Sequence, residues 1–313
     1  FITSRCNIRC KMCFYWEPVE AKSHEEITLD EVRQIAGGMG SLFWLLIGGG
    51  EPFVRKDLPE IVKIFYEVNG LRHLTIPTNA TYPDLTADMV EDILTSCPDL
   101  FFNLNLSLNG IGASHDELCQ SEGVFDSFLE TYARLKALKV RYPNLGLGIN
   151  TTHSAYNQET LSPIIDYVVD ELDAVDNISL GLVRGRPKES GALAVDINAY
   201  KGAVEKIEGL AVQNRIRAFG AMFGAVAFVK DILMRRIIAR TVAEGWQIPC
   251  LAGRVSLVID EKTNVYPCEM LPAVGNLRDS GFDLPAVLGD PTMNEAPARI
   301  EDENCFCTHE CAY

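Results

Sequence analysis

The chain has 313 residues, of which 47% are hydrophobic, enough to bury a large core in one α/β barrel with a small appendage. Its formal net charge is −15 and its pI is about 4.8, which disfavours binding to nucleic acid or an anionic membrane, because their phosphates repel an acidic protein. The longest apolar run, residues 218–229, is too short to cross a bilayer, and no secretory signal is visible. We therefore expect a cytoplasmic protein, and since Phe1 lies just before the first cysteine, we expect a longer natural chain.

Three cysteines near the start, Cys6, Cys10 and Cys13, have the spacing C-x3-C-x2-C. Three thiolates on one loop can hold three corners of a cubane iron–sulfur cluster and leave the fourth iron without a protein ligand. An iron with an open position can bind and activate a second molecule. The basic residues between and beside the cysteines form either a docking spot for an acidic ferredoxin or flavodoxin or a solvated charge; they are Arg5, Arg9 and Lys11.

Short β-rich apolar runs then alternate with amphipathic stretches, which predicts a parallel α/β barrel, complete or partial, with six β/α units. The expected strands are Phe1–Ser4, Leu42–Ile47, Leu71–Pro77, Phe101–Ser107, Leu145–Thr151 and Asn177–Leu182, and the last five are apolar enough for burial on both faces. Helices are expected after the capping box Thr28–Glu31, after Asp57, after a cap at Thr86, and over Val124–Val140 and Gln158–Leu172. In such barrels, chemistry gathers at the carboxyl ends of the strands.

The turn GGGEP, Gly48–Pro52, follows the second strand and therefore lies on the same rim as the cysteines. Its glycines let main-chain groups approach a ligand closely, and Glu51 can accept hydrogen bonds from an ammonium group. Taken alone, a glycine-rich turn of this kind more often only connects two secondary-structure elements and binds no ligand.

Five of the ten cysteines lie in the last quarter of the chain: Cys250, Cys268, Cys305, Cys307 and Cys311. A β-hairpin turning at Glu261–Asn264 would bring Cys250 and Cys268 side by side. Without a secretory context, this pattern favours a metal site over disulfides. A zinc ion would stabilise a small domain as well as an iron–sulfur cluster would. Five thiols exceed the four that one site requires, so which four bind, and whether a second site exists, stays open. We expect Cys97 and Cys119 to be buried small hydrophobes; a hydrogen-donor role would require a thiol that faces the rim.

Together, C-x3-C-x2-C and GGEP resemble the radical S-adenosylmethionine (SAM) superfamily over the barrel, to roughly Gly185. The resemblance implies that Cys6, Cys10 and Cys13 bind a [4Fe–4S] cluster whose open iron holds the methionine half of SAM. One electron then yields a 5′-deoxyadenosyl radical that takes hydrogen from a substrate. Gly49, Gly50 and Glu51 would receive the methionyl ammonium.

The resemblance places further residues near SAM: Met12, Phe14, Ser107, Asn109, Asn150, Thr151 and Arg184. Ser107 matches the serine of an S-x-D-G segment, in which Asn109 replaces the aspartate. Isolated rim residues such as Asn150, Thr151 and Arg184 are more often structural than ligand contacts. No spacing singles out a catalytic acid, base or radical-quenching residue.

The tail resembles the SPASM/twitch extension of radical SAM enzymes, from Cys250–Gly253 and from the V-Y-P-C segment that ends at Cys268. Its compressed end, C-x-C-x3-C, favours one auxiliary [4Fe–4S] cluster over two. The expected organisation is a partial (β/α)6 barrel over residues 1–186, a helical connector over 187–247 and an auxiliary-cluster domain over 248–313.

The resulting hypothesis is a SAM-cleaving oxidoreductase that modifies a peptide, a protein or a secondary metabolite by oxidation, cross-linking or epimerisation. A dehydrogenase or epimerase of a small molecule such as a sugar is the alternative within the same class. A non-catalytic iron–sulfur electron carrier is the alternative from another class, but a carrier has no need for GGGEP beside an open iron.

Overall fold

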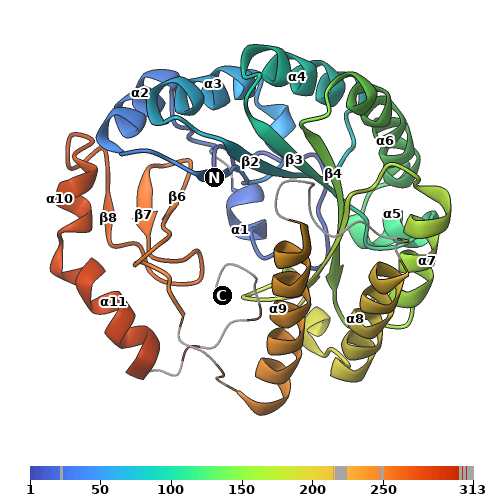
Figure 1. Cartoon of the computed structure of the whole chain (residues 1–313). Coiled ribbons are helices and arrows are strands. Elements are labelled where there is room, and N and C mark those ends of the chain that lie inside the picture. Colours follow the sequence, from blue (N-terminus) through green and yellow to red (C-terminus); the bar gives the residue numbers. More distant parts are fainter. Residues whose placement is uncertain are drawn as a thin grey trace.

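The computed structural model describes residues 1–21, 24–213, 215, 224–245, 247, 250–302, 305 and 308. A five-stranded parallel sheet in the order β1-β2-β3-β4-β5 curls into part of a barrel (Figure 1). Its strands are β1 (Trp44–Leu46), β2 (His73–Thr78), β3 (Phe101–Ser107), β4 (Leu145–His153) and β5 (Asn177–Leu182). The sheet confirms the expected α/β architecture.

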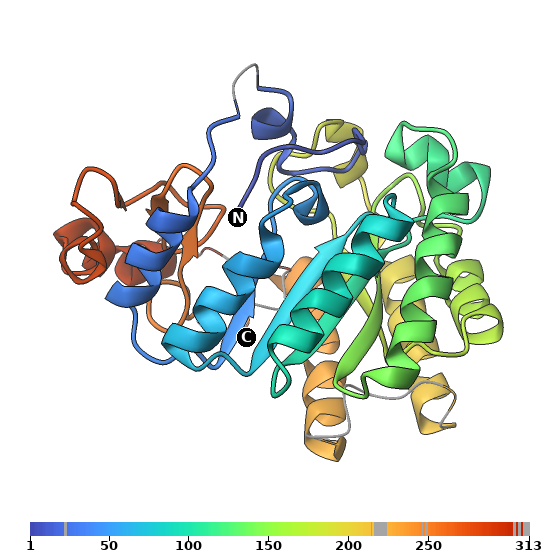
Figure 2. The same cartoon turned by 90° about the horizontal axis from the view of Figure 1, so that it is seen from above.

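Helices cover the outer face of this sheet, as Figures 1 and 2 show. They are α2 (Leu29–Gly38), α3 (Leu58–Asn69), α4 (Pro83–Ser96), α5 (Ala113–Cys119), α6 (Val124–Arg141), α7 (Leu161–Glu171) and α8 (Ile197–Val212), with the short α1 (Trp16–Val19) after the cysteine loop. Alternate strand residues such as Leu74, Phe102, Leu104 and Leu147 are fully buried in the main core. Burial of this apolar layer holds the curled sheet in shape.

Some sequence expectations need correction. In place of a first strand at Phe1–Ser4, the structure has a single parallel bridge between Thr3 and Gly49. Thr86 does not cap a helix, because Pro83 already begins α4 three residues earlier and Thr86 lies buried within it. The capping box at Thr28 is confirmed, with Thr28 and Glu31 each accepting from the other's main-chain N–H. Asp57 precedes α3 as expected, but its carboxylate binds Arg55 rather than the helix.

The inner face of the sheet is polar, which the expectation of strands buried on both faces missed. Asn103 and Asn105 alternate with buried leucines along β3, so the sequence period of two separates a polar face from an apolar one. The register places Asn105 between Pro77 of β2 and Gly148 of β4, and places Gly148 beside Asn177 of β5. A polar row therefore crosses the inner wall of the barrel.

The rest of the chain lies along the open side of the curled sheet (Figure 1). It includes η2 (Ser190–Leu193), α9 (Gly224–Glu244), a small antiparallel sheet of β6 (Val258–Ile259), β7 (Asn264–Tyr266) and β8 (Gly275–Asn276), and the helices α10 (Leu284–Leu288) and α11 (Pro291–Asp302). The pair β6–β7 confirms the expected hairpin. Arg278 binds Glu31 of α2, which joins the tail to the barrel. No helix in the described ranges is both long and apolar enough to span a membrane.

Candidate active site

The cysteine loop is fixed by main-chain hydrogen bonds on two sides. Arg9 and Lys11 donate to the carbonyls of Cys119 (3.1 Å) and Leu118 (3.0 Å) at the end of α5. On the other side, Lys188 donates to the Cys13 carbonyl (3.0 Å) and Glu189 to that of Lys11 (2.9 Å). The loop is therefore preorganised by two distant segments.

The three thiols suit a cluster better than a single metal ion. In the described part of the chain, no three Cys, His, Asp or Glu side chains are gathered tightly enough for one ion. A cubane fits this spacing, because each thiolate binds a different iron and the sulfurs stay farther apart. Burial raises the pKa of Cys6 to about 12 and that of Cys13 to about 11, so cluster binding releases their protons. Asn79 donates from Nδ2 to the Cys6 Sγ (3.8 Å).

The GGGEP turn packs directly on residues 1–5, the segment that leads into the cysteine loop. Gly50 donates its N–H to Thr3 (2.8 Å) and Glu51 donates to Arg5 (2.8 Å). A Cβ on Gly49, whose φ is +143°, would lie 2.2 Å from the Thr3 carbonyl oxygen, and one on Gly50 would lie 2.1 Å from that of Arg5. Only glycine permits this contact.

Glu51 is 1% exposed and braces the turn against the end of β2. Its carboxylate accepts hydrogen bonds from Phe53 N (3.1 Å), Thr78 Oγ1 (2.9 Å) and Asn79 N (2.7 Å). Burial raises the pKa of Glu51 to about 7, although these hydrogen bonds oppose the effect. Glu51 therefore shapes the rim as well as supplying a carboxylate there.

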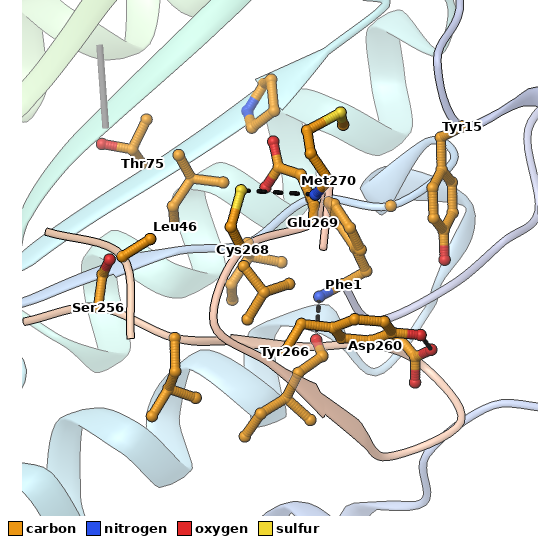
Figure 3. A pocket seen from close by; sticks show the side chains of 18 of the residues that line it. Phe1, Tyr15, Leu46, Thr75, Ser256, Asp260, Tyr266, Cys268, Glu269 and Met270 are labelled. Atoms are coloured by element: carbon orange, nitrogen blue, oxygen red, sulfur yellow. Dashed lines mark hydrogen bonds between the residues drawn. The ribbon is translucent and has the colours of Figure 1, made fainter. Parts of the chain in front are cut away.

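A cavity of about 2770 Å³ opens between the inner wall of the barrel and the tail. Cys10 and Cys13 line it from one side and Cys250, Cys268 and Cys305 from the other. Figure 3 shows Leu46 and Thr75 of the sheet facing the same space as Cys268, Glu269 and Met270 of the tail. The expected residues Met12, Phe14, Gly49, Ser107, Asn109, Asn150 and Arg184 also line it.

Gly50 and Glu51, two of the expected SAM contacts, do not line this cavity, and Glu51 is engaged in the hydrogen bonds given above. Two further expected contacts, Thr151 and Asn109, also have structural partners. Thr151 points away from the cavity, donates to the Leu108 carbonyl (2.7 Å) and is 3% exposed, so its neighbour Thr152 lines the cavity in its place. Asn109 accepts from Thr152 N (2.8 Å) through its side-chain oxygen and so ties the end of β3 to β4.

Arg184 sits where the cysteine loop meets the tail. Its guanidinium lies 4.9 Å from the centre of the Phe14 ring and forms an ion pair with Glu269, the residue after Cys268. Its Nη1 is buried and has no hydrogen-bond partner among the described residues. Since a buried donor without a partner is costly, Nη1 is available to an acceptor on a bound molecule.

The sulfurs of Cys250 and Cys268, before and after the hairpin, have the same local geometry. Cys250 Sγ accepts from Ala252 N (3.4 Å), and Cys268 Sγ accepts from Met270 N (3.4 Å). Hydrogen bonds to the cysteine sulfurs are a recurring feature of iron–sulfur sites. Cys305 lines the same cavity, whereas Cys307 and Cys311 lie outside the described residues.

The basic residues around the cysteines are already engaged. Arg5 pairs with Glu26 (2.7 Å), Lys11 pairs with Glu117 (2.8 Å), and Arg9 donates to the carbonyls of Cys6 (2.7 Å) and Ile8 (2.9 Å). Their first role is to stabilise the loop, which leaves less free positive charge for an acidic electron donor than the sequence indicated.

Sequence reasoning missed the polar wall of the barrel and the buried His115. Asn103 donates from Nδ2 to Asn105 Oδ1 (3.0 Å), and both side chains lie over glycines of β4. A Cβ on Gly148 would come within 2.2 Å of Asn105 Oδ1. The alternation N-x-N-x-S-x-N from Asn103 to Asn109 was the available signal.

Comparison with known proteins places this geometry in a family. The profile of the radical SAM superfamily matches residues 1–168. GTP 3′,8-cyclase of Alkaliphilus metalliredigens is 23% identical over 263 residues, which are 80% of this chain and 79% of the cyclase.

Solved structures share the fold over nearly the whole chain. Streptococcus suis SuiB bound to its precursor peptide SuiA has a TM-score of 0.64 at 15% identity, over 95% of this chain and 65% of that of SuiB. The protein anSMEcpe with bound AdoMet and a Cp18Cys peptide has a TM-score of 0.63 at 15% identity, over 94% of this chain and 80% of its own. This chain thus spans slightly less than two thirds of SuiB. A family match that includes the cysteine loop and covers more than half of the chain makes this protein a member of the radical SAM superfamily, whose enzymes use a [4Fe–4S] cluster and SAM.

Proposed function

We propose that this enzyme takes hydrogen from a peptide or protein substrate, with oxidation, cross-linking or epimerisation of that substrate as the outcome. The proposal rests on the cavity, whose volume of about 2770 Å³ greatly exceeds the roughly 300–1,000 Å³ of ordinary small-molecule pockets. Such a space has room for SAM together with a segment of polypeptide.

The chemistry of the cavity wall supports a peptide. Strands β2 to β5 contain no Asp, Glu, Lys or Arg, and their inner face consists largely of amide and hydroxyl side chains. In the described structure the side-chain amides of Asn150 and Asn177 have no hydrogen-bond partner of their own. Side-chain amides both donate and accept, which matches the alternating N–H and C=O groups of a peptide main chain.

The inner face of strands β2 to β5 disfavours GTP, the substrate in the name of the cyclase relative. A nucleoside triphosphate requires several cationic or main-chain N–H donors around its phosphates. The strands supply no cation, so the cations that line the cavity lie outside this wall: Arg184, which is paired with Glu269, and Arg186, Arg254 and Lys262. The net charge of −15 further repels a polyanion.

Within this proposal, the residues of the chain have distinct tasks. Cys6, Cys10 and Cys13 would hold the cluster, which supplies the electron that cleaves SAM. The Glu51 carboxylate would balance the charge of the methionyl ammonium beside Gly49 and Gly50. The shape of the cavity would keep water and other C–H bonds away from the reactive carbon.

The tail would complete the active site with an auxiliary [4Fe–4S] cluster. The N–H···S bonds at Cys250 and Cys268, and the position of Cys305 on the same cavity, support such a centre. We propose that residues 1–186 form the barrel unit, 187–247 the connector and 248–313 the auxiliary-cluster unit. A cluster that borders the substrate cavity could accept an electron when a substrate radical is oxidised.

The test compares substrates under anaerobic conditions with SAM and dithionite. Candidate precursor peptides encoded beside the gene, GTP and free sugars are each added to the reconstituted enzyme, and 5′-deoxyadenosine and substrate mass are measured. A deuterated peptide should transfer deuterium into 5′-deoxyadenosine and change in mass. Turnover with GTP or sugars but with no peptide would refute the peptide proposal, whereas no 5′-deoxyadenosine in any arm would favour the electron carrier.

A further inference from the structure

The turn that follows β2 places Asn79 beside Cys6, the first of the three cysteines in the N-terminal loop. The main-chain N–H of Asn79 donates to the buried carboxylate of Glu51 (2.7 Å). The next residue, Ala80, has a φ of +57°, a left-handed conformation that is uncommon for residues other than glycine, and its carbonyl accepts from Thr131 Oγ1 (2.7 Å). The turn is therefore held in place by bonds that do not involve the Asn79 side chain.

The side-chain amide of Asn79 has a single possible orientation. Its Oδ1 accepts hydrogen bonds from the main-chain N–H of Thr81 (3.1 Å) and from the Thr81 hydroxyl (2.6 Å). Because a main-chain N–H can only donate, the oxygen and the nitrogen of this amide cannot be exchanged. Nδ2 therefore faces the cysteine loop, where it donates to Asn7 Oδ1 (2.9 Å) and to the Cys6 Sγ (3.8 Å).

A ring of three side chains keeps the amide in this position. Asn7 donates from its own Nδ2 to Thr81 Oγ1 (2.8 Å), and Thr81 in turn donates to Asn79. The two hydrogens of Asn79 Nδ2 are thus divided between Asn7 and Cys6. Since the amide of asparagine is neutral and its nitrogen can only donate, the direction of the N–H···S bond does not depend on the protonation of any group. The distance to Cys6 is long for an oxygen acceptor but suits the larger radius of sulfur.

We propose that Asn79 donates a hydrogen bond to the Cys6 thiolate and thereby raises the reduction potential of the SAM-binding cluster. Hydrogen bonds to cluster sulfurs stabilise the reduced state, because that state carries more negative charge. Asn79 is thus a positioning residue that acts through Cys6. Because Glu51 holds the main chain of Asn79, the GGGEP turn also fixes the place of this donor.

Thr81 provides a matched control for Asn79. Its hydroxyl belongs to the same ring of hydrogen bonds, but it donates to Asn79 rather than to a cysteine. Thr81→Val keeps the shape of the side chain, and the main-chain N–H at position 81 still orients the Asn79 amide. Asn79→Leu keeps the approximate shape of asparagine and removes the donor to Cys6.

The experiment is a potentiometric titration of the reconstituted full chain without substrate, followed by the EPR signal that changes when SAM is added. Asn79→Leu and Asn79→Ala should lower the reduced-to-oxidised ratio at fixed potential by about threefold, or about 28 mV for one electron. Thr81→Val should keep the wild-type midpoint. A wild-type midpoint in an Asn79 variant that retains its iron, or an equal shift in Thr81→Val, overturns the proposal.

A second measurement keeps Asn79 in place and decides the case in which its variants do not hold iron. Asparagine side-chain amides are labelled with 15N, and the coupling of this nitrogen to the reduced cluster is measured by pulsed EPR. Wild type is compared with Asn7→Asp, which keeps the oxygen that accepts from Asn79 but lacks the neighbouring amide nitrogen. A 15N coupling in both proteins supports the hydrogen bond. No coupling in the wild type, or a coupling that disappears in Asn7→Asp, overturns the proposal.

Discussion

Replacing Glu51 by Gln tests how the ionisable carboxylate of the GGGEP turn affects the pH dependence of stability. The carboxylate is buried and accepts hydrogen bonds from Phe53, Thr78 and Asn79. Glutamine has nearly the same shape but cannot ionise. The substitution removes the charge, and it also turns the amide NH2 toward a main-chain N–H, because both carboxylate oxygens accept one. The pH dependence of stability, rather than its absolute value, therefore reports the effect of the charge.

The expected magnitude follows from the pKa of Glu51, which burial raises from 4.5 to about 7. At roughly 1.4 kcal/mol per pH unit, this difference corresponds to about 3 kcal/mol. The folded protein binds the proton more tightly than the unfolded chain does, so the free energy of unfolding decreases as pH rises from about 4.5 to about 7. Below this window the contribution is fully present, and Glu51→Gln should lack this part of the pH dependence.

The assay is anaerobic urea unfolding at several pH values between 4 and 8, with Glu117→Gln as the control. Glu117 is exposed, and its pairing with Lys11 lowers its pKa, so its loss should change the profile only below about pH 4.5 and leave the decrease between about 4.5 and 7 in place. Identical pH profiles for wild type and Glu51→Gln would refute the reasoning. SAM affinity, measured by equilibrium dialysis, should rise with pH through about 7 in the wild type and not in the variant, because an ammonium group favours the ionised carboxylate.

Three further predictions concern the cavity and its borders. Gly148→Ala should displace the asparagine on the neighbouring strand and reduce substrate turnover several-fold, while SAM cleavage without substrate persists; 5′-deoxyadenosine and product are measured in parallel. Cys10→Ala should abolish SAM cleavage, whereas Cys268→Ala should spare part of it, and equal losses of 5′-deoxyadenosine would instead assign the tail a role in holding the fold. Arg184→Met should lower the unfolding free energy by about 1–3 kcal/mol, because it leaves the half-buried Glu269 unpaired; the double variant with Glu269→Leu should recover most of that loss in urea titrations.

The sequence predicted the bounds of some strands correctly and overestimated the length of another. Phe101–Ser107 and Asn177–Leu182 coincide with β3 and β5, since each is a short apolar run between helical stretches. The strand expected at Leu42–Ile47 was too long, because only Trp44–Leu46 pairs with β2 at the sheet edge. Local propensity does not reveal how many residues find a partner.

The candidate site was predictable only in part, because a sequence motif identifies the expected ligands but not the residues that pack around them in the fold. C-x3-C-x2-C marked the cysteine loop, but the hydrogen bonds from α5 and from residues 188–189 that hold it depend on tertiary contacts. Cys119 was expected to be buried and is, yet the small buried group that it forms with Ile8 and Val124, on which Cys10 packs, joins positions more than a hundred residues apart. The ion pair between Glu269 and Arg184 likewise could not be predicted, because it depends on how the tail packs against the barrel.

Glu31 serves two parts of the molecule at once. Its carboxylate accepts the Thr28 N–H that closes the start of α2 (2.8 Å) and also receives Arg278 through Nε (2.6 Å) and Nη2 (3.1 Å). Cutting away the tail would therefore loosen the first turn of a helix that belongs to the barrel. Barrel and tail should consequently melt together in a single cooperative transition, and neither half should be expected to behave as an independent module when expressed alone.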